Sequence, residues 1–331
     1  NVNTVAFASI AAINSIAISS IQAMNTVALA VAGGGTSYAG ITWSTDDTTP
    51  ASTSYGVKFG IVGAQGIVNC NDKNATGYKA TYEHDGSSWS TTGNCAGTHG
   101  VAAGGGTQSA GIVANGYDDV GTDESNVTEE YNGSSWSTGN NSVEGSAYQT
   151  GGGMLQTAQL MTGGSKYSPT VRDLSMTQTY NGTNWANESV ASDGRGSATS
   201  GESAGGGLDA FLSAGGALDA GDSSAVQIFN QTAGSWTSKA ATPTTRRYNG
   251  SSTDGTRVYK IGGVQAGGSW TPTADVESWV DNTWTTENSI PAGRTGPGCG
   301  SGGLESAAGS ASAIGGNPGV TDTYYIAAAT S

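Results

Sequence analysis

The chain is a succession of short runs that alternate apolar and polar residues, separated by clusters of Gly, Ser, Thr and Asn. In one recurring motif, the run closes on an aromatic residue, a tight polar turn follows, and a Trp comes next. The clearest copy is YNGSSW at Tyr131–Trp136. Strict alternation predicts a half-buried strand, and Asn-Gly or Asp-Gly between two such runs predicts a hairpin, because these residues tolerate positive φ.

The motif returns in altered form at four other places, and a sixth Trp lies upstream without the aromatic lead-in. A Trp motif that recurs about every 50 residues indicates an array of similar supersecondary units. Burial of one large aromatic residue removes roughly 150–250 Å² from water, which is worth about 4–6 kcal/mol at ~25 cal/mol/Å². We therefore expect one Trp to anchor each unit. The anchors recur every 46 to 51 residues and are Trp43, Trp89, Trp136, Trp185, Trp236 and Trp284.

A second recurring signal is a pair of small residues that ends an apolar strand, as in AQLMTGG at 158–164. Each repeat then reads as four strands, of which the second ends in the small pair, the third in the aromatic residue, and the fourth carries the Trp. Six pairs beside six Trp residues predict six four-stranded units. The pairs are Gly63-Ala64, Asn115-Gly116, Gly163-Gly164, Gly215-Gly216, Gly262-Gly263 and Gly315-Gly316.

The two ends of the array are incomplete in complementary ways. Residues 300–326 supply three strands without a Trp strand, whereas Trp43 has no strands before it in its own unit. We predict that a strand at Gly40–Thr45 completes the last unit, because closing a ring removes exposed sheet edges. The predicted fold is all-β, a closed six-bladed β-propeller over residues 40–331. Its blades are 55–92, 100–139, 150–188, 201–239, 250–287, and 300–326 with 40–45.

Residues 1–32 follow a different repeat of 11 residues, VNTVAFASIAA, INSIAISSIQA and MNTVALAVAGG. An 11-residue period is compatible with a right-handed coiled coil. Short strands are favoured instead, because β-branched residues dominate and charges to solvate a helix are almost absent. We expect a stem that oligomerises or docks on a neighbouring protein; the alternative is a local β-element packed on the main domain. Residues 33–39 are a Gly-rich linker.

The Gly-Gly doublet after an apolar strand, followed by an aromatic residue five to seven positions before a Trp, resembles the kelch-type repeat over about residues 40–327. The segment GGGTQSAGIVANGY…VTEEYNGSSWSTG (104–139) is similar to repeats in virion structural proteins of marine tailed bacteriophages, and the leading 11-residue units resemble N-terminal segments of such proteins. The resemblance implies a tail-, fibre- or capsid-attached particle component. Several repeats depart from it by lacking the second Gly, and the loops are longer than in compact kelch domains.

Charge and cysteine content narrow the function classes. The chain has 26 acidic and 12 basic residues and a net charge of −14. Nucleic-acid binding and attraction to anionic membranes both need basic patches, so neither is expected, and no apolar run reaches the 18 residues of a membrane span. Three cysteines, Cys70, Cys95 and Cys299, give no even disulfide framework. Cys70 and Cys95 share a repeat and are either a disulfide pair or two thiols.

Basic residues stand ten positions after four of the Trp anchors, and Ser146 takes this place in the second repeat. A propeller would bring these positions near the mouth of its central channel. They predict either a ring of donors for an anionic or sugar ligand, or structural ties to backbone carbonyls between blades. Trp270, in the loop GGSWTPT, is a candidate for stacking on a sugar. The four basic residues are His99, Arg195, Arg246 and Arg294.

Metal and catalytic signals are weak. Asp118, Asp119 and Asp123 are candidate calcium ligands, although no loop matches a complete calcium signature and a solvated acidic loop is the alternative. No other metal and no cofactor is expected. A sialidase would need an arginine triad and a Tyr nucleophile, whereas only six Arg exist. The two His, His84 and His99, do not form a copper site, and His84 is expected to be solvated in a polar turn.

These observations favour a non-enzymatic virion surface protein with no catalytic residues. Its propeller would contact a host surface or glycan, and its residues 1–32 would bind other virion proteins or further copies of the chain, giving a homo-oligomer on the particle exterior. The runner-up is a bacterial extracellular lectin or adhesin on the same fold. A glycan-cleaving propeller and an intracellular kelch scaffold are less favoured.

Overall fold

The structure is a computed structural model, and its described residues all belong to the compact unit Gly40–Ser331. Several predicted features lie outside them: the 1–32 stem, the 33–39 linker, the pairs Gly63-Ala64 and Gly315-Gly316, the acidic candidates Asp118, Asp119 and Asp123, Arg195, and Trp270. The described residues are 43–46, 48–50, 57–60, 67–70, 79–85, 87–117, 124–166, 172–192, 196, 199–202, 207–218, 221–253, 257–265, 271–295, 312–314 and 323–326.

The described strands form five antiparallel four-stranded sheets, each in the order first, second, third and fourth strand of one repeat. Sheet I contains β2 (Val57–Gly60), β3 (Ile67–Cys70), β4 (Thr81–His84) and β5 (Trp89–Thr91). Sheet II contains β6 (Ala103–Thr107), β7 (Ala110–Ala114), β8 (Thr128–Tyr131) and β9 (Trp136–Thr138). Sheet III contains β10 (Thr150–Leu155), β11 (Ala158–Thr162), β14 (Thr177–Tyr180) and β15 (Trp185–Asn187).

The two following repeats have the same plan. Sheet IV contains β16 (Thr199–Glu202), β17 (Phe211–Ala214), β20 (Val226–Asn230) and β21 (Ser235–Lys239), with the short 3₁₀ helix η3 (Gly207–Ala210) before β17. Sheet V contains β23 (Gly250–Thr253), β24 (Val258–Ile261), β26 (Val276–Val280) and β27 (Thr283–Glu287). Three two-stranded sheets extend the loops: β12 (Ser165–Lys166) with β13 (Arg172–Asp173), β18 (Ala217–Leu218) with β19 (Gly221–Asp222), and β22 (Arg246–Arg247) with β25 (Val264–Gln265).

Sheet VI joins the two ends of the repeat array. It is three-stranded, with β29 (Thr323–Ile326) between β28 (Ser312–Ile314) and β1 (Trp43–Asp46). Strand β1 is antiparallel to β29, and the register places Trp43 opposite Ile326 and Thr45 opposite Tyr324. The predicted pairing of the strand that carries Trp43 with the last repeat is therefore confirmed.

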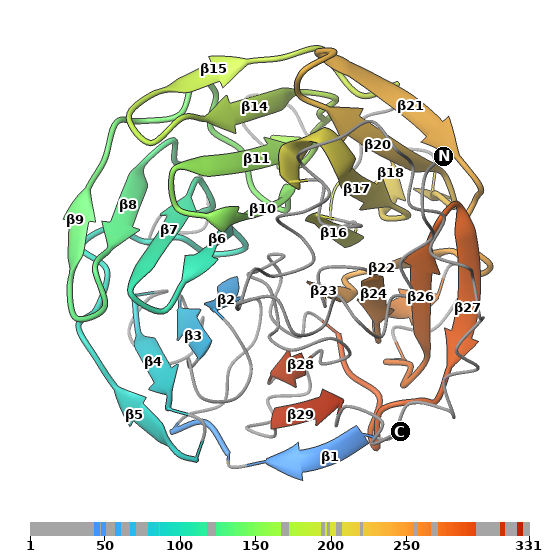
Figure 1. The fold of residues 1–331 in the computed structure, drawn as a ribbon, viewed down its shortest axis with the longest axis horizontal. Helices are drawn as coiled ribbons and strands as arrows, with labels where there is room; N and C mark the ends of the chain where they lie inside the picture. Colours follow the sequence, from blue (N-terminus) through green and yellow to red (C-terminus); the bar gives the residue numbers. More distant parts are fainter. Residues whose placement is uncertain are drawn as a thin grey trace, which may run out of the picture. The chain divides into compact units, whose positions relative to one another are not determined.

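The sheets are arranged as a propeller-like ring (Figure 1). The innermost described strands of successive sheets lie next to one another in the order β2, β6, β10, β16, β23 and β28. The fourth strands, which carry the Trp anchors, lie at the outside of the ring (Figure 1). The fold is thus all-β, as predicted. Among the described residues, η3 is the only helical segment.

Aromatic pairs hold the outer half of sheets I to IV. The strand register places Tyr131 opposite Trp136, with ring centroids 4.9 Å apart, and equivalent pairs occur in sheets III and IV. In sheet I the same position is taken by His84, which faces Trp89 at 5.0 Å and is 2% exposed. The prediction of a solvated His84 is wrong, because β4 extends two residues beyond Tyr82 and carries His84 into the core.

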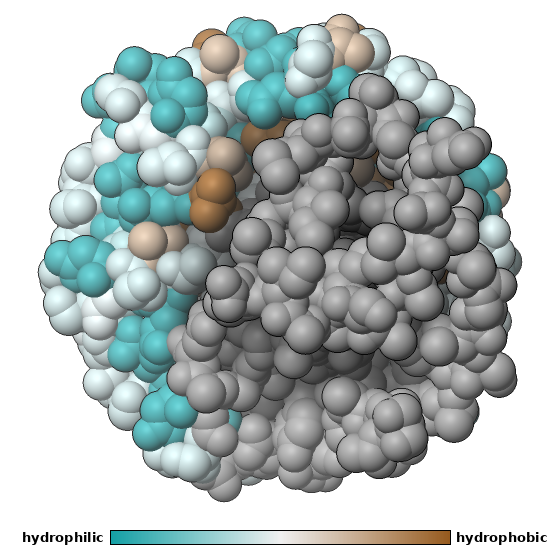
Figure 2. Space-filling view, viewed as in Figure 1, coloured by the Kyte–Doolittle hydropathy of each residue, from teal (hydrophilic) through white to brown (hydrophobic). Residues whose placement is uncertain are grey.

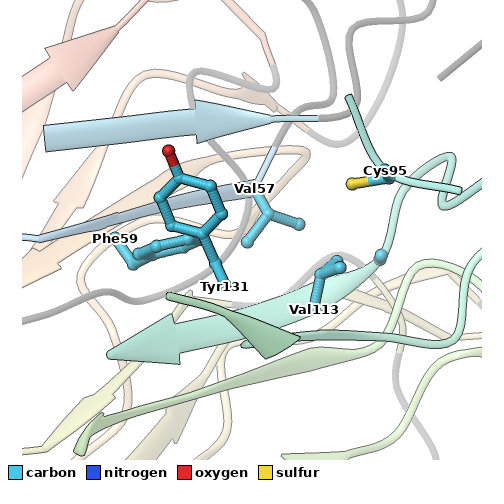
Figure 3. Close-up of a cluster of buried hydrophobic side chains, with 6 residues drawn as sticks. Val57, Phe59, Cys95, Val113 and Tyr131 are labelled. Atoms are coloured by element: carbon cyan, nitrogen blue, oxygen red, sulfur yellow. The ribbon is translucent and has the colours of Figure 1, made fainter. Parts of the chain in front are cut away.

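The hydrophobic core is divided among the interfaces between sheets. Figure 3 shows one of them: Val57 and Phe59 of β2 pack against Val113 and Tyr131 of sheet II, together with Cys95. All five of these side chains are at most 3% exposed. The side chain of Cys70 lies outside the described residues, so the question of its pairing with Cys95 stays open. Each sheet is therefore stabilised by its neighbours as much as by its own strands.

The predicted hairpins are present, but their turns differ from the expected type. Tyr131 and Trp136 are paired, so four residues form the loop. The Asn132 side-chain oxygen accepts the backbone N–H groups of Ser134 and Ser135 at 3.1 and 3.0 Å. In this loop, positive φ occurs at Gly133, at 92°, and not at Asn132. Two successive positive φ values, the expected pattern, occur instead in the two-residue turn Asp281-Asn282 of sheet V.

Candidate functional site

The antiparallel topology gives the ring two distinct faces. We call one the doublet face: it carries the small-residue pairs after each second strand and the loops that lead into each first strand. The opposite, hairpin face carries the hairpins between first and second strands and the aromatic-to-Trp turns. Described residues visible in Figure 2 are largely hydrophilic, with apolar side chains in scattered places. Of the basic candidates predicted from the sequence, His99, Arg246 and Arg294 belong to the doublet face.

The small pairs that name this face adopt left-handed backbone conformations. Their two φ values are 66° and 96° at Asn115-Gly116 and 63° and 96° at Gly262-Gly263, and Gly163-Gly164 and Gly215-Gly216 are similar. Gly tolerates this region without steric cost, and Asn is among the few other residues that visit it. The predicted turns are confirmed at these four places; Gly63-Ala64 and Gly315-Gly316 lie outside the described residues.

His99 and Arg246 make equivalent contacts in sheets II and V. His99 bonds through Nδ1 to the carbonyl oxygen of Asn115 at 2.9 Å and through Nε2 to Glu129 at 3.0 Å. Arg246 donates through Nη1 to the carbonyl oxygen of Gly262 at 2.6 Å, and its Nη2 lies 3.1 Å from Glu277. In both cases a basic side chain joins the first residue of the small pair to a carboxylate on the third strand.

The backbone at the basic positions also binds the preceding sheet. The N–H of Gly216 in sheet IV donates to the carbonyl oxygen of Arg246 at 3.1 Å, and the N–H of Gly263 in sheet V donates to that of Arg294 at 2.8 Å. Gly116 makes the same bond to Ser146 at 2.9 Å. Positions 146, 246 and 294 are therefore joints, each with its carbonyl bonded to the preceding sheet, and His99 has the equivalent position before sheet II.

Burial decides between the two interpretations of the basic residues. The side chains of His99, Arg246 and Arg294 are 0% exposed, so none of the three offers its charged group to a ligand in solvent. Their expected role as ligand donors at the channel mouth is not supported, and the geometry fits the structural alternative of ties between sheets. Arg195 lies outside the described residues, and its expected role stays a prediction.

In sheets II, III and V, the charge on the third strand matches the residue at the joint. Sheet III has Ser146 at the joint, and there the third strand carries the neutral Gln178 instead of a Glu. The Gln178 side-chain oxygen accepts the backbone N–H of Val143 at 2.8 Å. Sheet II has His99 with Glu129, and sheet V has Arg246 with Glu277. A buried carboxylate thus occurs where a buried cation faces it, as the cost of an unpaired buried charge requires.

The pKa values of Glu129 and Lys260 are shifted by their buried, charged surroundings. Burial raises the pKa of Glu129, but bonds from His99 and from the backbone N–H groups of Gly97 and Ala96 outweigh it and hold that pKa below its usual value. In sheet V, Lys260 lies 3.2 Å from Glu277 and donates to the carbonyl oxygen of Thr244 at 2.6 Å. Burial, reinforced by the charge of Arg246, lowers the pKa of Lys260 to about 8 although Glu277 opposes the shift.

A cluster of three Tyr residues on the doublet face was not predicted from the sequence. Tyr117 and Tyr148 have ring centroids 5.6 Å apart, and Tyr148 and Tyr248 have centroids 5.8 Å apart. We call these three residues the tyrosine cluster. Tyr117 is 8% exposed and the other two rings are half-buried. The cluster joins loops that lead into sheets III and V, 100 positions apart in the chain.

The backbone at the cluster is strained. Tyr148 has φ = 56° and Tyr248 has φ = 53°, and Val101, at the same place in its repeat, has φ = 55°. Bulky and β-branched residues rarely adopt positive φ. The last repeat has Gly296 at this position, which would be unstrained there. The sequence signal for the tyrosine cluster is an aromatic residue 12 positions after Trp136 and after Trp236, at a place where the last repeat has Gly.

The described cations near the cluster already contact carboxylates. Arg247, adjacent to Tyr248, lies with Nε 2.6 Å from Asp222, whose side chain is fully buried. Lys166 lies 3.0 Å from Glu144 on the same face. Local charge is therefore largely balanced, within a protein whose net charge is −14.

Other features of the described residues do not offer a ligand site. A cavity of about 10 Å³ between sheets II and III is lined mainly by apolar groups, including Ile112, Met161 and Trp185, and is too small for more than one water molecule. In the described part of the chain, no group of three or more His, Cys, Asp or Glu side chains is placed to hold a metal ion. The calcium hypothesis concerns Asp118, Asp119 and Asp123 and stays a prediction. None of the helical segments in the described ranges could cross a bilayer.

Comparison with known proteins supports the fold and nothing finer. No protein-family model matches the chain, and no curated protein matches its sequence. Among solved structures, that of YjhT, which is also a propeller, is similar with a TM-score of 0.63 and 15% sequence identity. The similarity covers 84% of this chain and 95% of the YjhT chain. At this identity the likeness concerns the fold alone.

Proposed function

We propose that this protein is a non-enzymatic virion surface component, a tail-fibre, tail-attached or capsid-decorating protein, whose six-bladed kelch-like propeller contacts host glycans through its doublet face. The observation that carries the proposal is the tyrosine cluster. It combines half-buried aromatic rings with a strained backbone, and strained positions in folded proteins concentrate at ligand-binding and catalytic sites.

The six-bladed ring is part of the proposal. Five four-stranded sheets and the three-stranded sheet VI follow one another along the chain. In sheets II to V the anchor Trp also bonds to the sheet before it or to the segment after that sheet: Trp185 Nε1 donates to Thr128 at 3.0 Å, and Trp284 Nε1 donates to the carbonyl oxygen of Ala240 at 3.1 Å. Trp43 continues this pattern by donating to the carbonyl oxygen of Asn288, after sheet V, at 2.9 Å. This supports sheet VI as the sixth blade.

Glycan contact is favoured because aromatic rings at a surface bind sugars by stacking while their polar tips stay hydrated. Tyr is suited to this role because it offers a large rigid contact area at a low cost in side-chain entropy. Binding is favoured over cleavage by the state of the described carboxylates at the joints and beside the tyrosine cluster. Glycoside hydrolysis needs two carboxyl groups facing the scissile bond, whereas Glu129 and Glu277 are buried against cations and Asp222 and Glu144 each contact one.

The virion context rests on the sequence resemblance and on residues 1–32. Their apolar 11-residue repeats are suited to self-association or to docking on another particle protein. This part of the proposal predicts a homo-oligomer that becomes a monomer when residues 1–32 are removed, with the propeller still folded. Sedimentation of the two forms tests it, and an unchanged assembly state would exclude the stem.

A glycan array probed with the full-length chain tests the binding function, with bound protein and released sugar both measured. We expect binding of a defined group of glycans with no released product. Release of monosaccharide would replace the proposal by a glycan-cleaving enzyme, and no binding to any glycan would refute it. Immunoblotting of purified particles separates a virion component from a bacterial adhesin, which would be absent from them.

A further inference from the structure

We propose that Tyr148 and Tyr248 form the contact platform for the glycan and that this platform selects neutral sugars over sialylated or sulfated ones. The inference rests on the proposed function and names the residues and the ligand class of the same site. The observations that carry it are the geometry of the ring pair, the backbone conformation beneath it, and the pairing of the neighbouring cations.

The two rings meet although their loops lead into different, non-adjacent sheets. Tyr148 precedes sheet III and Tyr248 precedes sheet V, and their centroids are 5.8 Å apart at an interplanar angle of 64°. Tyr117 is almost fully buried and contacts Tyr148 edge-on at 83°. The Tyr148 ring is therefore held between Tyr117 and Tyr248, and both outer rings remain partly open to solvent.

The backbone conformation at Tyr148 and Tyr248 would suit Gly better than Tyr. Gly would adopt φ near 55° without steric cost, and the last repeat has Gly296 at this position. The chain instead has Tyr at both places where the rings converge, each at positive φ. Because the fold needs only the conformation and not the ring, the two Tyr side chains fit a role in binding.

The charges around the pair set the ligand class. A sialylated or sulfated glycan needs a cation able to exchange solvent for the anion. Two described cations beside the loops that carry the rings contact carboxylates, Arg247 with Asp222 and Lys166 with Glu144, and the protein as a whole repels anions at −14. A neutral sugar meets no such opposition and can stack on the rings while its hydroxyl groups stay hydrated.

The test is a titration of the full-length protein with three oligosaccharide probes of equal length: neutral N-acetyllactosamine-type, sialylated and sulfated. The variant Tyr148→Asn/Tyr248→Asn removes both rings and keeps a residue that tolerates positive φ. The control is Asp281→Gly, which relieves a positive φ of 48° in the exposed Asp281-Asn282 turn of the hairpin face and leaves the tyrosine cluster unchanged. Circular dichroism and thermal melting establish that each variant is folded.

We expect the wild-type protein to bind the neutral probe at least tenfold more tightly than either anionic probe. The double variant should lose at least tenfold in affinity for the neutral probe, and Asp281→Gly should keep the wild-type affinity. If no probe and no array glycan binds, the proposed function itself fails. If glycans bind but the double variant binds equally well, or if an anionic probe is preferred, this inference alone is overturned.

Discussion

Replacement of Glu277 is the most severe test of the pairing between buried cations at the joints and a buried carboxylate on the third strand. We call this pairing charge matching. The Glu277 Oε2 lies 3.1 Å from Arg246 Nη2 and 3.2 Å from Lys260 Nζ, and the Glu277 Oε1 accepts the Thr244 hydroxyl at 2.6 Å. Both cations are 0% exposed and Glu277 is 2% exposed. The substitution Glu277→Gln keeps the shape of the side chain but leaves two buried cations without a carboxylate.

Breaking a buried ion pair from one side costs about 3–5 kcal/mol, because the remaining charge stays desolvated. We therefore expect Glu277→Gln to lower the free energy of unfolding by about 3–5 kcal/mol at pH 7. Urea denaturation followed by tryptophan fluorescence measures it, with the slope against urea used to check that the unfolding transition remains comparable.

Sheet III supplies a matched control for this prediction. At the positions equivalent to Arg246, Lys260 and Glu277 it has Ser146, Met161 and Gln178, which carry no charge. The triple variant Arg246→Ser/Lys260→Met/Glu277→Gln transplants that set into sheet V and should recover at least half of the lost stability. A Glu277→Gln protein whose free energy of unfolding lies within about 1 kcal/mol of the wild-type value would refute the charge-matching argument. A triple variant no more stable than the single variant would also refute it, because neighbouring residues couple by about 0.5–3 kcal/mol in double-mutant cycles.

Three further predictions concern single positions. Thr128→Val should cost at most about 1 kcal/mol in urea denaturation, because Trp236 shows that the anchor Trp can also reach a backbone carbonyl, that of Ser189 at 3.1 Å. Lys260 has a folded pKa of about 8 against 10.5 for the ordinary group, so the unfolded chain holds more protons between these values. The stability of wild type relative to Lys260→Met should then rise from pH 8 to 10.5, and a flat difference would contradict this. Gly263→Ala should cost more than about 1 kcal/mol, because φ is +96° and the new Cβ would lie 2.8 Å from the carbonyl oxygen of Arg247; unchanged thermal melting would exclude this strain.

Much of the ring could be predicted because each repeat carries its own local signals. The Trp anchors, the small pairs and the incomplete ends can be seen directly in the sequence. The mismatch between the two ends predicted the pairing of β1 with β29, which the structure shows. His84 was misplaced because TYEHDGSSW offers two candidate positions for the residue opposite Trp89. Only the register, in which β4 continues to His84, distinguishes them.

The site was harder to predict, because burial and convergence are not local properties. Spacing correctly placed His99 and Arg246 in loops between repeats, but their carboxylate partners Glu129 and Glu277 lie 30 and 31 residues further along the chain, on another strand. Tyr148 and Tyr248 gave no alternating pattern, since they stand in loops at positive φ. Their contact depends on how the ring brings together loops 100 residues apart.

A structure of the full-length protein bound to the best neutral glycan from the array tests the central claim most directly. The account predicts a sugar ring stacked on Tyr148 and Tyr248 at the doublet face, with the guanidinium of Arg247 still on Asp222. A glycan bound on the hairpin face, or bound on the doublet face without contact to either ring, would contradict it.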